Sequence, residues 1–431
     1  MSELLQSGLP WWGWALMLTG AVAIVSVIGA LFLPDWPQPP LTATYEVAPD
    51  SDQFLEYAAG VVDFPVYRGG SATILQNGDG FYPPMLEAIR AARETVNFEV
   101  YIFEPDEIGR QFMDAFKERA RAGVEVRLLI DWFGGLKLRR RHRDELRAAG
   151  VRVELFRPLA LRNLVRIYRR THRRAIVIDG EVAFTGGAAV SKKWEGDVRN
   201  HHQWRDSMTR VTGPLVTGIQ AAFTTNWVHC TGEVLAGPRF YPERGPEPGP
   251  WALSVVSSPS DSMQPIRLLF WMSFRNARRR IWISNSYFIP DVRLRDAVMD
   301  RARAGVDVRI LVPGDHTDAV PIQLAGRSFY EELLAAGVRI FEYQAAMMHA
   351  KTAVVDDAWA IVGSANMDER SMELNEENVV GIADRDFARA VAAGVEHDLT
   401  RSREVRLEEW RKRPVWQRGF EKLAKILIEQ Y

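Results

Sequence analysis

The chain has 431 residues and a formal net charge of −1, with 54 basic and 55 acidic side chains. This length allows two domain-sized cores, and the near-neutral charge excludes a general electrostatic attraction to nucleic acid. A single cysteine, Cys230, excludes an internal disulfide framework, so nothing in the sequence points to an oxidising compartment.

The N-terminal segment from Trp11 to Leu33 carries no charged residue. At about 1.5 Å per residue, a helix of this length crosses a hydrocarbon core of roughly 30 Å. Tryptophans at both ends resemble the aromatic belts of membrane proteins. No Lys or Arg occurs before Arg68, so the segment lacks the basic start of a signal peptide. We therefore expect a tail over residues 1–10 and then one permanent transmembrane helix over residues 11–33.

The expected location is the cell membrane, with the body of the chain in the cytoplasm, although the positive-inside rule has no nearby charges to count. A proline-rich stretch that starts at Pro34 predicts a stiff polar linker over residues 34–65. Such a linker keeps the body close to the bilayer. The body divides into a first half, residues 66–245, and a second half, residues 246–400.

The first half alternates between helix and strand. Met85 to Arg93 has helical spacing and leads into a strand from Val96 to Ile102. Gly109 to Ala122 is again helical, and Gly123 ends it before a strand from Val124 to Ile130. Such alternation predicts an α/β fold in which each half is a mostly parallel sheet flanked by helices.

Two basic runs follow, over residues 137–143 and 162–174, and they interleave cations with apolar residues. They would suit anionic headgroups, and a solvated helix face is the alternative. The second run ends in a histidine motif composed of His172, Arg174 and Asp179, which the small residues Gly186 and Gly187 follow.

The second half repeats the landmarks of the first half in the same order. R-A-R-A-G-V-E-V-R at residues 119–127 recurs as R-A-R-A-G-V-D-V-R at residues 301–309. Tyr101-Ile102-Phe103 is answered by Tyr287-Phe288-Ile289. Repeats of this kind indicate two homologous halves.

The histidine motif returns in the second half as His349, Lys351 and Asp356. The β-branched residues around Ala353 predict a strand, on which residues two apart share one side. His349 and Lys351 would then lie together, as an imidazole that attacks phosphorus beside an ammonium that neutralises its oxygens. A lone motif of this kind is more often a core histidine, but the second copy at His172 favours one shared site.

These motifs resemble the phospholipase D superfamily and, within it, the bacterial cardiolipin synthases. The resemblance rests on the doubled H-x-K-x4-D pattern, the turn Gly363-Ser364-Ala365-Asn366, the run from Met367 to Glu377, and Trp204-Arg205-Asp206. It covers roughly residues 70–400 and implies a fold of two phospholipase D-like halves.

The resemblance implies a double displacement that needs no metal and no cofactor. His172 would attack the phosphodiester of a phospholipid, and His349 would protonate the leaving alcohol and deprotonate the acceptor. Asp206 and Glu377 match the acidic residues that orient the two histidines. The motif residues Asp179 and Asp356 are expected to order their strands, and the expected phosphate contacts are Ser364, Asn366 and Gly187.

The first half departs from the family pattern at Arg174, where lysine is usual, and at Ala189, where asparagine is usual. Arginine keeps the charge and can bind phosphate with two nitrogens, but it is longer and planar. Either the phosphate site is asymmetric or the first half is weakened.

The predicted function is that of a membrane-anchored phosphatidyltransferase that acts on a lipid alcohol such as phosphatidylglycerol. Its expected partners are an anionic phospholipid and the membrane, and no nucleic acid. The alternatives are a phosphodiesterase that uses water, on lipid or nucleic acid, and a weakened lipid-binding scaffold. A C-terminal helix over residues 401–431 is expected to dock on the body, and membrane contact is the alternative for this helix.

Overall fold

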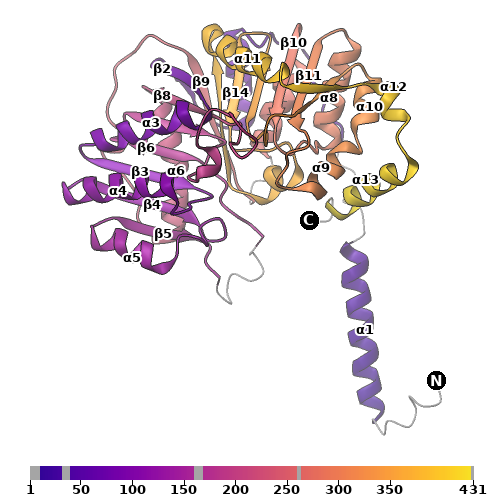
Figure 1. Ribbon diagram of the computed structural model, residues 1–431, viewed down its shortest axis with the longest axis horizontal. Coiled ribbons are helices and arrows are strands. Elements are labelled where there is room, and N and C mark those ends of the chain that lie inside the picture. The colour runs from indigo at the N-terminus through magenta and orange to yellow at the C-terminus, as the bar shows by residue number, and fades with distance from the viewer. Residues whose placement is uncertain (1–9, 32–38, 160–167, 260–263, 429–431) are drawn as a thin grey trace.

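The computed structural model describes residues 10–31, 39–159, 168–259 and 264–428. Two sheets lie beside each other with helices around them, and helix α1 (Trp11–Leu31) projects from this body (Figure 1). Residues 162–167 of the second basic run and residues 1–9 of the predicted tail lie outside the described ranges.

The first half forms a seven-stranded sheet in the order β2-β8-β7-β6-β3-β4-β5. Its strands are β2 (Ser71–Gln76), β3 (Thr95–Val100), β4 (Glu125–Asp131), β5 (Arg152–Phe156), β6 (Ala175–Ile178), β7 (Val182–Gly186) and β8 (Ser207–Thr212). Its helices are α3 (Asn77–Ala91), α4 (Glu107–Arg121), α5 (Arg140–Ala148), the short 3-10 helix η3 (Lys192–Trp194) and α6 (Leu215–Thr231). Helices α3, α4 and α5 pack on one face of the sheet, and α6 packs on the other.

The second half forms a nine-stranded sheet in the order β1-β9-β15-β14-β13-β10-β11-β12-β16. Its strands are β1 (Val66–Arg68), β9 (Trp251–Ser257), β10 (Arg280–Asn285), β11 (Asp307–Pro313), β12 (Arg339–Tyr343), β13 (Lys351–Val355), β14 (Trp359–Gly363), β15 (Glu377–Ala383) and β16 (Ser402–Val405). Its helices are α7 (Pro265–Arg275), α8 (Val292–Arg303), α9 (Val320–Arg327), α10 (Tyr330–Ala335), the π-helical turn η4 (Arg370–Leu374), α11 (Arg385–Leu399), α12 (Leu407–Arg411) and α13 (Val415–Ile428).

Both sheets are mixed, which corrects the prediction of mostly parallel sheets. Strands β3, β4 and β5 run parallel, as do β10, β11 and β12, and helices connect them. The motif strands β6 and β13 instead turn back directly into β7 and β14 and pair with them as antiparallel hairpins. The βα alternation on which the prediction depended therefore stops before each histidine motif, because a tight turn permits only antiparallel pairing.

The two sheets share an apolar core between the halves. Successive side chains of a strand point to opposite faces, so Val177 of β6 faces this shared core while Ile176 faces the helices α3 and α4. Val354 of β13 enters the same shared core from the second half, as do Val391 of α11 and Trp227 of α6. The halves therefore pack as one body, and this packing fixes how the two motif strands lie relative to each other.

Part of the predicted linker is a helix that belongs to the second half. Helix α2 (Asp52–Val62) buries Phe54 in the core of that half, where its ring lies edge-on to Trp359 with centroids 5.6 Å apart. Strand β1 pairs with β9, so residues 66–68 join the second sheet rather than open the first half. Apolar residues at helical spacing in this segment explain why it packs instead of remaining extended.

The C-terminal segment also differs from the single helix predicted for residues 401–431. Strand β16 pairs with β12 at the edge of the second sheet, and the two helices α12 and α13 follow it. Trp410 of α12 is buried against Tyr330, with ring centroids 4.8 Å apart. The expected docking on the body is therefore present, although a strand begins it.

Helix α1 matches the helix predicted from Trp11, as far as the described range extends. The predicted membrane crossing is not supported, because in the described part of the chain no helix combines the length and the apolar content that a bilayer crossing requires.

We expect Phe54→Ala to lower the free energy of unfolding by about 3–5 kcal/mol, because it leaves a cavity in the core of the second half. Tyr45→Ala is the control, since Tyr45 is 85% exposed, and its effect should stay within about 0.5 kcal/mol. Urea unfolding followed by tryptophan fluorescence measures both. Equal stability of the two variants would mean that residues 52–62 are a loose linker after all.

Candidate active site

The two histidines lie where the halves meet, each just before its motif strand. The backbone N–H of His172 donates to the carbonyl of Glu376 at 2.8 Å, and that of His349 donates to the carbonyl of Arg205 at 2.7 Å. Each bond therefore connects a motif of one half to a segment of the other half. The structure brings His172 and His349 into one site, as the sequence predicts.

A carboxylate from the opposite half orients each imidazole. Nδ1 of His172 lies 3.0 Å from both carboxylate oxygens of Glu377, which begins β15 of the second half. Nδ1 of His349 lies 2.7 Å from Oδ2 of Asp206, which precedes β8 of the first half. With the proton on Nδ1, each Nε2 keeps its lone pair for chemistry. The two predicted orienting carboxylates thus lie where the resemblance implies, and they cross between the halves.

Two residues that are predicted to bind phosphate contact these carboxylates. Ser364 is fully buried and donates its hydroxyl to Glu377 at 2.5 Å. Gly187 lies against Asp206, and a Cβ there would come within 2.2 Å of its Oδ1. The indole N–H of Trp194 also donates to Asp206 at 2.8 Å. Ser364 therefore bonds an orienting carboxylate, and Gly187 leaves room for one. Neither is among the lining residues of the cavity in the described chain, and their contact with phosphate stays a prediction.

The two motif cations occupy corresponding positions. Nζ of Lys351 donates to the carbonyl of His349 at 2.6 Å and lies 3.1 and 3.2 Å from its ring nitrogens. Arg174 is buried and donates through Nη1 to the carbonyl of His172. Each cation therefore braces the histidine of its own motif. Arg174 lines the cavity described below, whereas Lys351 lies behind His349 and is not among the lining residues of the described chain.

The motif aspartates lie at the far ends of the motif strands. Asp179 accepts three backbone N–H bonds from residues 93–95, at 2.8, 2.8 and 2.7 Å. Asp356 accepts three from residues 278–280, at 2.8, 2.7 and 2.9 Å. Both have positive φ, 53° and 54°, at the start of the hairpin turn. They order the strands, as expected, and within the described residues neither lines the cavity, which removes both from the group that meets substrate.

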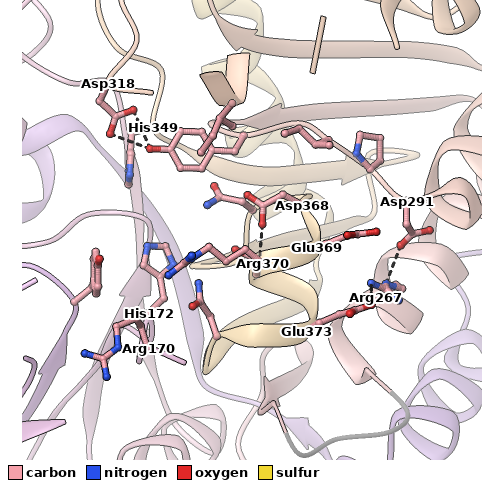
Figure 2. Close-up of a pocket in the computed structure, with 18 of the residues that line it drawn as sticks. Arg170, His172, Arg267, Asp291, Asp318, His349, Asp368, Glu369, Arg370 and Glu373 are labelled. Carbon is pink, nitrogen blue, oxygen red and sulfur yellow. Dashed lines mark hydrogen bonds and ion pairs between the residues drawn. The ribbon is translucent and has the colours of Figure 1, made fainter. Parts of the chain in front are cut away.

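A cavity of about 880 Å³ opens in front of both histidines. Figure 2 shows the histidines at one end of it and Arg267 with Asp291 at the other. Apolar side chains also line it, from α8, α9 and nearby loops: Phe133, Ile289, Pro290, Val292, Ile322 and Phe329. Among the charged lining residues, basic side chains outnumber acidic ones. This mixture fits an amphiphile with an anionic head.

Asn366 remains as a predicted phosphate contact that the structure places at the cavity. It is buried and lines the cavity, and its Oδ1 has no hydrogen-bond partner in the described part of the chain. An unpartnered buried amide is costly unless a ligand or water completes its hydrogen bonds. Its position therefore suits a polar group of the substrate.

Aromatic residues that were not predicted as site residues enclose the two imidazoles. The ring of Tyr101 lies 5.2 Å from that of His172, and the rings of Trp194 and Trp204 each lie 5.3 Å from that of His349. Tyr101 is part of a repeated landmark, and Trp204 is two residues before Asp206, so proximity to matched motifs was the available signal.

Burial and neighbouring cations keep both imidazoles neutral. Burial lowers the pKa of His172 well below its usual value, and the charges of Arg174 and Lys351 lower it further. Burial, followed by the charge of Lys351, lowers the pKa of His349 to about 4. Neutral imidazoles are the form that can attack phosphorus or accept a proton.

The two orienting carboxylates differ in charge. Burial raises the pKa of Glu377 to about 8, against the opposing effects of Ser364 and Arg174. Burial also acts to raise the pKa of Asp206, but His349 and Lys351 outweigh it and leave that pKa below its usual value. His349 therefore faces an ionised carboxylate, whereas His172 faces one that holds a proton at neutral pH.

Comparisons with known proteins agree with this geometry. The family model "Cardiolipin synthase, PLD-like domain" matches residues 85–201 and 272–399, which contain both motifs and Glu377 but not Asp206. "Probable cardiolipin synthase YwiE" of Bacillus subtilis is 32% identical over 378 residues, 88% of this chain and 75% of that protein. "Major cardiolipin synthase ClsA" of Bacillus subtilis is 34% identical over 360 residues, 83% of this chain and 74% of that protein.

Among solved structures, phosphatidylserine synthase of Haemophilus influenzae superposes with a TM-score of 0.65. The match covers 87% of this chain and 100% of that chain at 14% sequence identity. At this identity the likeness shows a shared fold alone.

We expect Lys351→Met to raise the melting temperature at pH 7, because burial lowers the pKa of Lys351 from 10.5 to about 7. Between about pH 7 and about pH 10, Lys351 is protonated in the unfolded chain and largely neutral in the folded state. The free energy of unfolding therefore rises with pH over this range. The advantage of the variant should shrink as the pH rises from about 7 and vanish above the unfolded pKa of 10.5, where Lys351 is neutral in both states.

Lys193→Met is the matched control, since Lys193 also lines the cavity but is only partly buried. Scanning calorimetry at several pH values measures the difference between each variant and the unmodified chain. A difference for Lys351→Met that does not change with pH would contradict the buried, weakly protonated lysine.

Proposed function

The chain belongs to the cardiolipin synthase family of phospholipase D-like proteins, and we propose that it joins two phosphatidylglycerol molecules into cardiolipin and releases glycerol. The observation that supports this most is the pair of neutral imidazoles, each oriented from the opposite half, at one end of an amphiphile-sized cavity. Two such groups are what a double displacement at phosphorus requires.

In the first step, Nε2 of His172 attacks the phosphorus of the donor lipid. An N–P bond forms and the bond from phosphorus to the glycerol headgroup breaks. His349 takes up a proton at Nε2 from solvent when the anionic phosphodiester binds, and it gives that proton to the departing oxygen. His172 suits the nucleophile because cations and a protonated Glu377 disfavour its imidazolium. His349 suits the acid because ionised Asp206 stabilises its imidazolium, and the anionic phosphodiester raises its pKa once bound.

In the second step, His349 takes the proton from a hydroxyl of the second phosphatidylglycerol. That oxygen attacks phosphorus, the N–P bond breaks, and His172 is regenerated as a neutral imidazole. Arg174 at the cavity wall neutralises charge on the phosphoryl oxygens in both transition states, as a guanidinium can with two N–H groups. The apolar lining residues hold the acceptor lipid and disfavour water as its competitor.

We expect purified full-length protein to convert labelled phosphatidylglycerol in detergent micelles to cardiolipin and glycerol, resolved by mass. His172→Ala and His349→Ala should each reduce the rate by at least about 10³-fold, because each step needs both groups. Phosphatidic acid as the main product would instead identify water as the acceptor. Lipid binding without turnover would indicate a scaffold.

His349→Ala also tests the assignment of roles. Without its acid and base both steps slow, but a phosphatidyl group that forms on His172 should persist there, because no base deprotonates the acceptor. Mass spectrometry after denaturation in alkali, where phosphohistidine is stable, detects this group. The control is His142→Ala, which changes a partly buried histidine of α5 that is not among the lining residues of the cavity in the described chain, and it should leave turnover intact. A trapped group on His349 in the His172→Ala variant would reverse the two roles.

The same proposal includes membrane attachment through α1, with the catalytic body on the cytoplasmic side. The support is the uncharged stretch from Trp11 to Leu33, the exposed side chains of Trp11, Leu16 and Leu18, and the projection of α1 from the body (Figure 1). An exposed apolar helix of this kind is unfavourable in water.

We expect the full chain to stay with membranes washed in alkaline carbonate, because burial of α1 side chains in lipid does not depend on charge. A chain that starts at residue 39 should be released by the same wash. Retention of both to the same extent would remove α1 as the anchor, and protease protection in spheroplasts reports the side on which the body lies.

A further inference from the structure

The exposed face of helix α13 is apolar. Val415, Trp416, Phe420, Leu423 and Ile426 are between 51% and 81% exposed. Successive residues of an α-helix are separated by about 100° of rotation, so these five side chains fall on one side of the helix. A contiguous group of large apolar side chains on a surface marks an interaction site.

The face of α13 that contacts the protein carries charged side chains beside Ala424, which packs against the core of the second half. Glu421 is 4% exposed and pairs with Arg413, whose Nη2 lies 3.1 Å from Oε2. Arg418 Nη2 lies 3.2 Å from a carboxylate oxygen of Glu331, and Lys425 Nζ lies 4.5 Å from the ring centroid of Phe329. A helix that docks to bury apolar area has the opposite arrangement. The polarity of α13 is therefore inverted with respect to the body.

The surroundings of this face favour a lipid surface over another protein. Lys412 and Lys422 are exposed on and beside α13 and supply positive charge. In the view of Figure 1, α13 lies on the side of the body from which α1 projects. Apolar side chains with neighbouring lysines, on the side where α1 leaves the body, match an interfacial helix at an anionic bilayer.

The same helix contacts the wall of the cavity. Phe329, on which Lys425 rests, lines the cavity, and so does Ile322 of α9, the helix against which α13 packs. One layer of side chains therefore separates α13 from the space in front of the histidines. If α13 lies on a membrane surface, its contact with the cavity wall also fixes the position of the cavity relative to that membrane.

We propose that α13 lies in the interface of an anionic bilayer, with Trp416, Phe420 and Leu423 below the headgroups. This second contact fixes the orientation of the body, which α1 alone would leave free to rotate, and it brings the cavity to the lipid surface. The proposal deepens the proposed function, since it specifies how a lipid reaches the site, but binding of α13 does not itself require turnover.

A fluorescent label tests the depth of α13 in the full chain. With Cys230→Ser as background, Phe420→Cys is labelled with an environment-sensitive dye, and the protein is reconstituted into vesicles of phosphatidylglycerol and phosphatidylcholine. We expect a blue shift and quenching by lipids that carry a spin label just below the headgroup. The control is Asp386→Cys on α11, whose side chain is 94% exposed, and this label should show neither change.

Two outcomes of the labelling experiment would overturn the proposal. The first is a label at position 420 that remains unquenched in vesicles. The second is a blue shift without lipid, together with a doubled mass in analytical ultracentrifugation, which would show that a second copy of the chain covers this face. Neither readout uses catalysis, so failure of the proposed reaction would not affect them.

A pair of variants then connects α13 to catalysis. Phe420→Glu with Leu423→Glu should lower the rate on vesicle phosphatidylglycerol by about tenfold or more, equivalent to about 1.4 kcal/mol, and leave the rate on micellar lipid unchanged. The matched control, Phe420→Leu with Leu423→Met, keeps the face apolar and should retain both rates. Equal losses on vesicles and micelles would contradict the proposal, because they would place the effect in the site or the fold.

Discussion

The crossed bonds between histidines and carboxylates are the constraint on which the rest of the structure depends. His172 is oriented by Glu377 of the second half, and His349 by Asp206 of the first half. Neither half alone holds an oriented imidazole, so the halves must pack with fixed geometry. The shared core of β6, β7, β13 and β14 and the backbone bonds at Glu376 and Arg205 provide it. Gene duplication explains the two motifs, but the crossing makes them a single site.

In the proposed mechanism, burial of the crossed pairs also gives the two histidines different roles. The pairs are similar in geometry, yet Glu377 retains a proton at neutral pH while Asp206 is ionised. A symmetric arrangement would let both imidazoles act as base or both as acid, and a double displacement needs one nucleophile and one proton carrier. Ser364 beside Glu377 and Trp194 beside Asp206 show that the asymmetry extends to the residues that hold the carboxylates. Departure of the first half from the family pattern therefore accompanies a division of labour between the two pairs.

Local patterns in the sequence predicted the parts of the site that lie within one motif. His172 and His349 could be found from spacing, and Asp206 and Glu377 from the resemblance, because each motif is contiguous in the chain. The contacts of Ser364 with Glu377 and of Gly187 with Asp206 were not predicted. The spacing of residues along the chain does not show which carboxylate lies beside each of them in the folded protein. The mixed sheets were missed for a similar reason: hairpins at Asp179 and Asp356 replace the helical connections of the preceding strands. The burial of α2 also depends on a contact with Trp359, about three hundred residues away along the chain.

Access to the lipid imposes a second constraint, and it accounts for features that the crossed pairs do not explain. Apolar and basic side chains line the cavity that would receive the lipid. A lipid that passed through water on its way from the bilayer would lose about 0.8 kcal/mol for each methylene exposed. Binding is therefore favourable only if the lipid leaves the bilayer at low cost. A body held by α1 alone could meet the bilayer with any side. The inverted polarity of α13, next to the cavity wall at Phe329, restricts this choice to one side. In the proposed arrangement, the exposed apolar side chains of α13, unfavourable in solution, align the two histidines with their substrate.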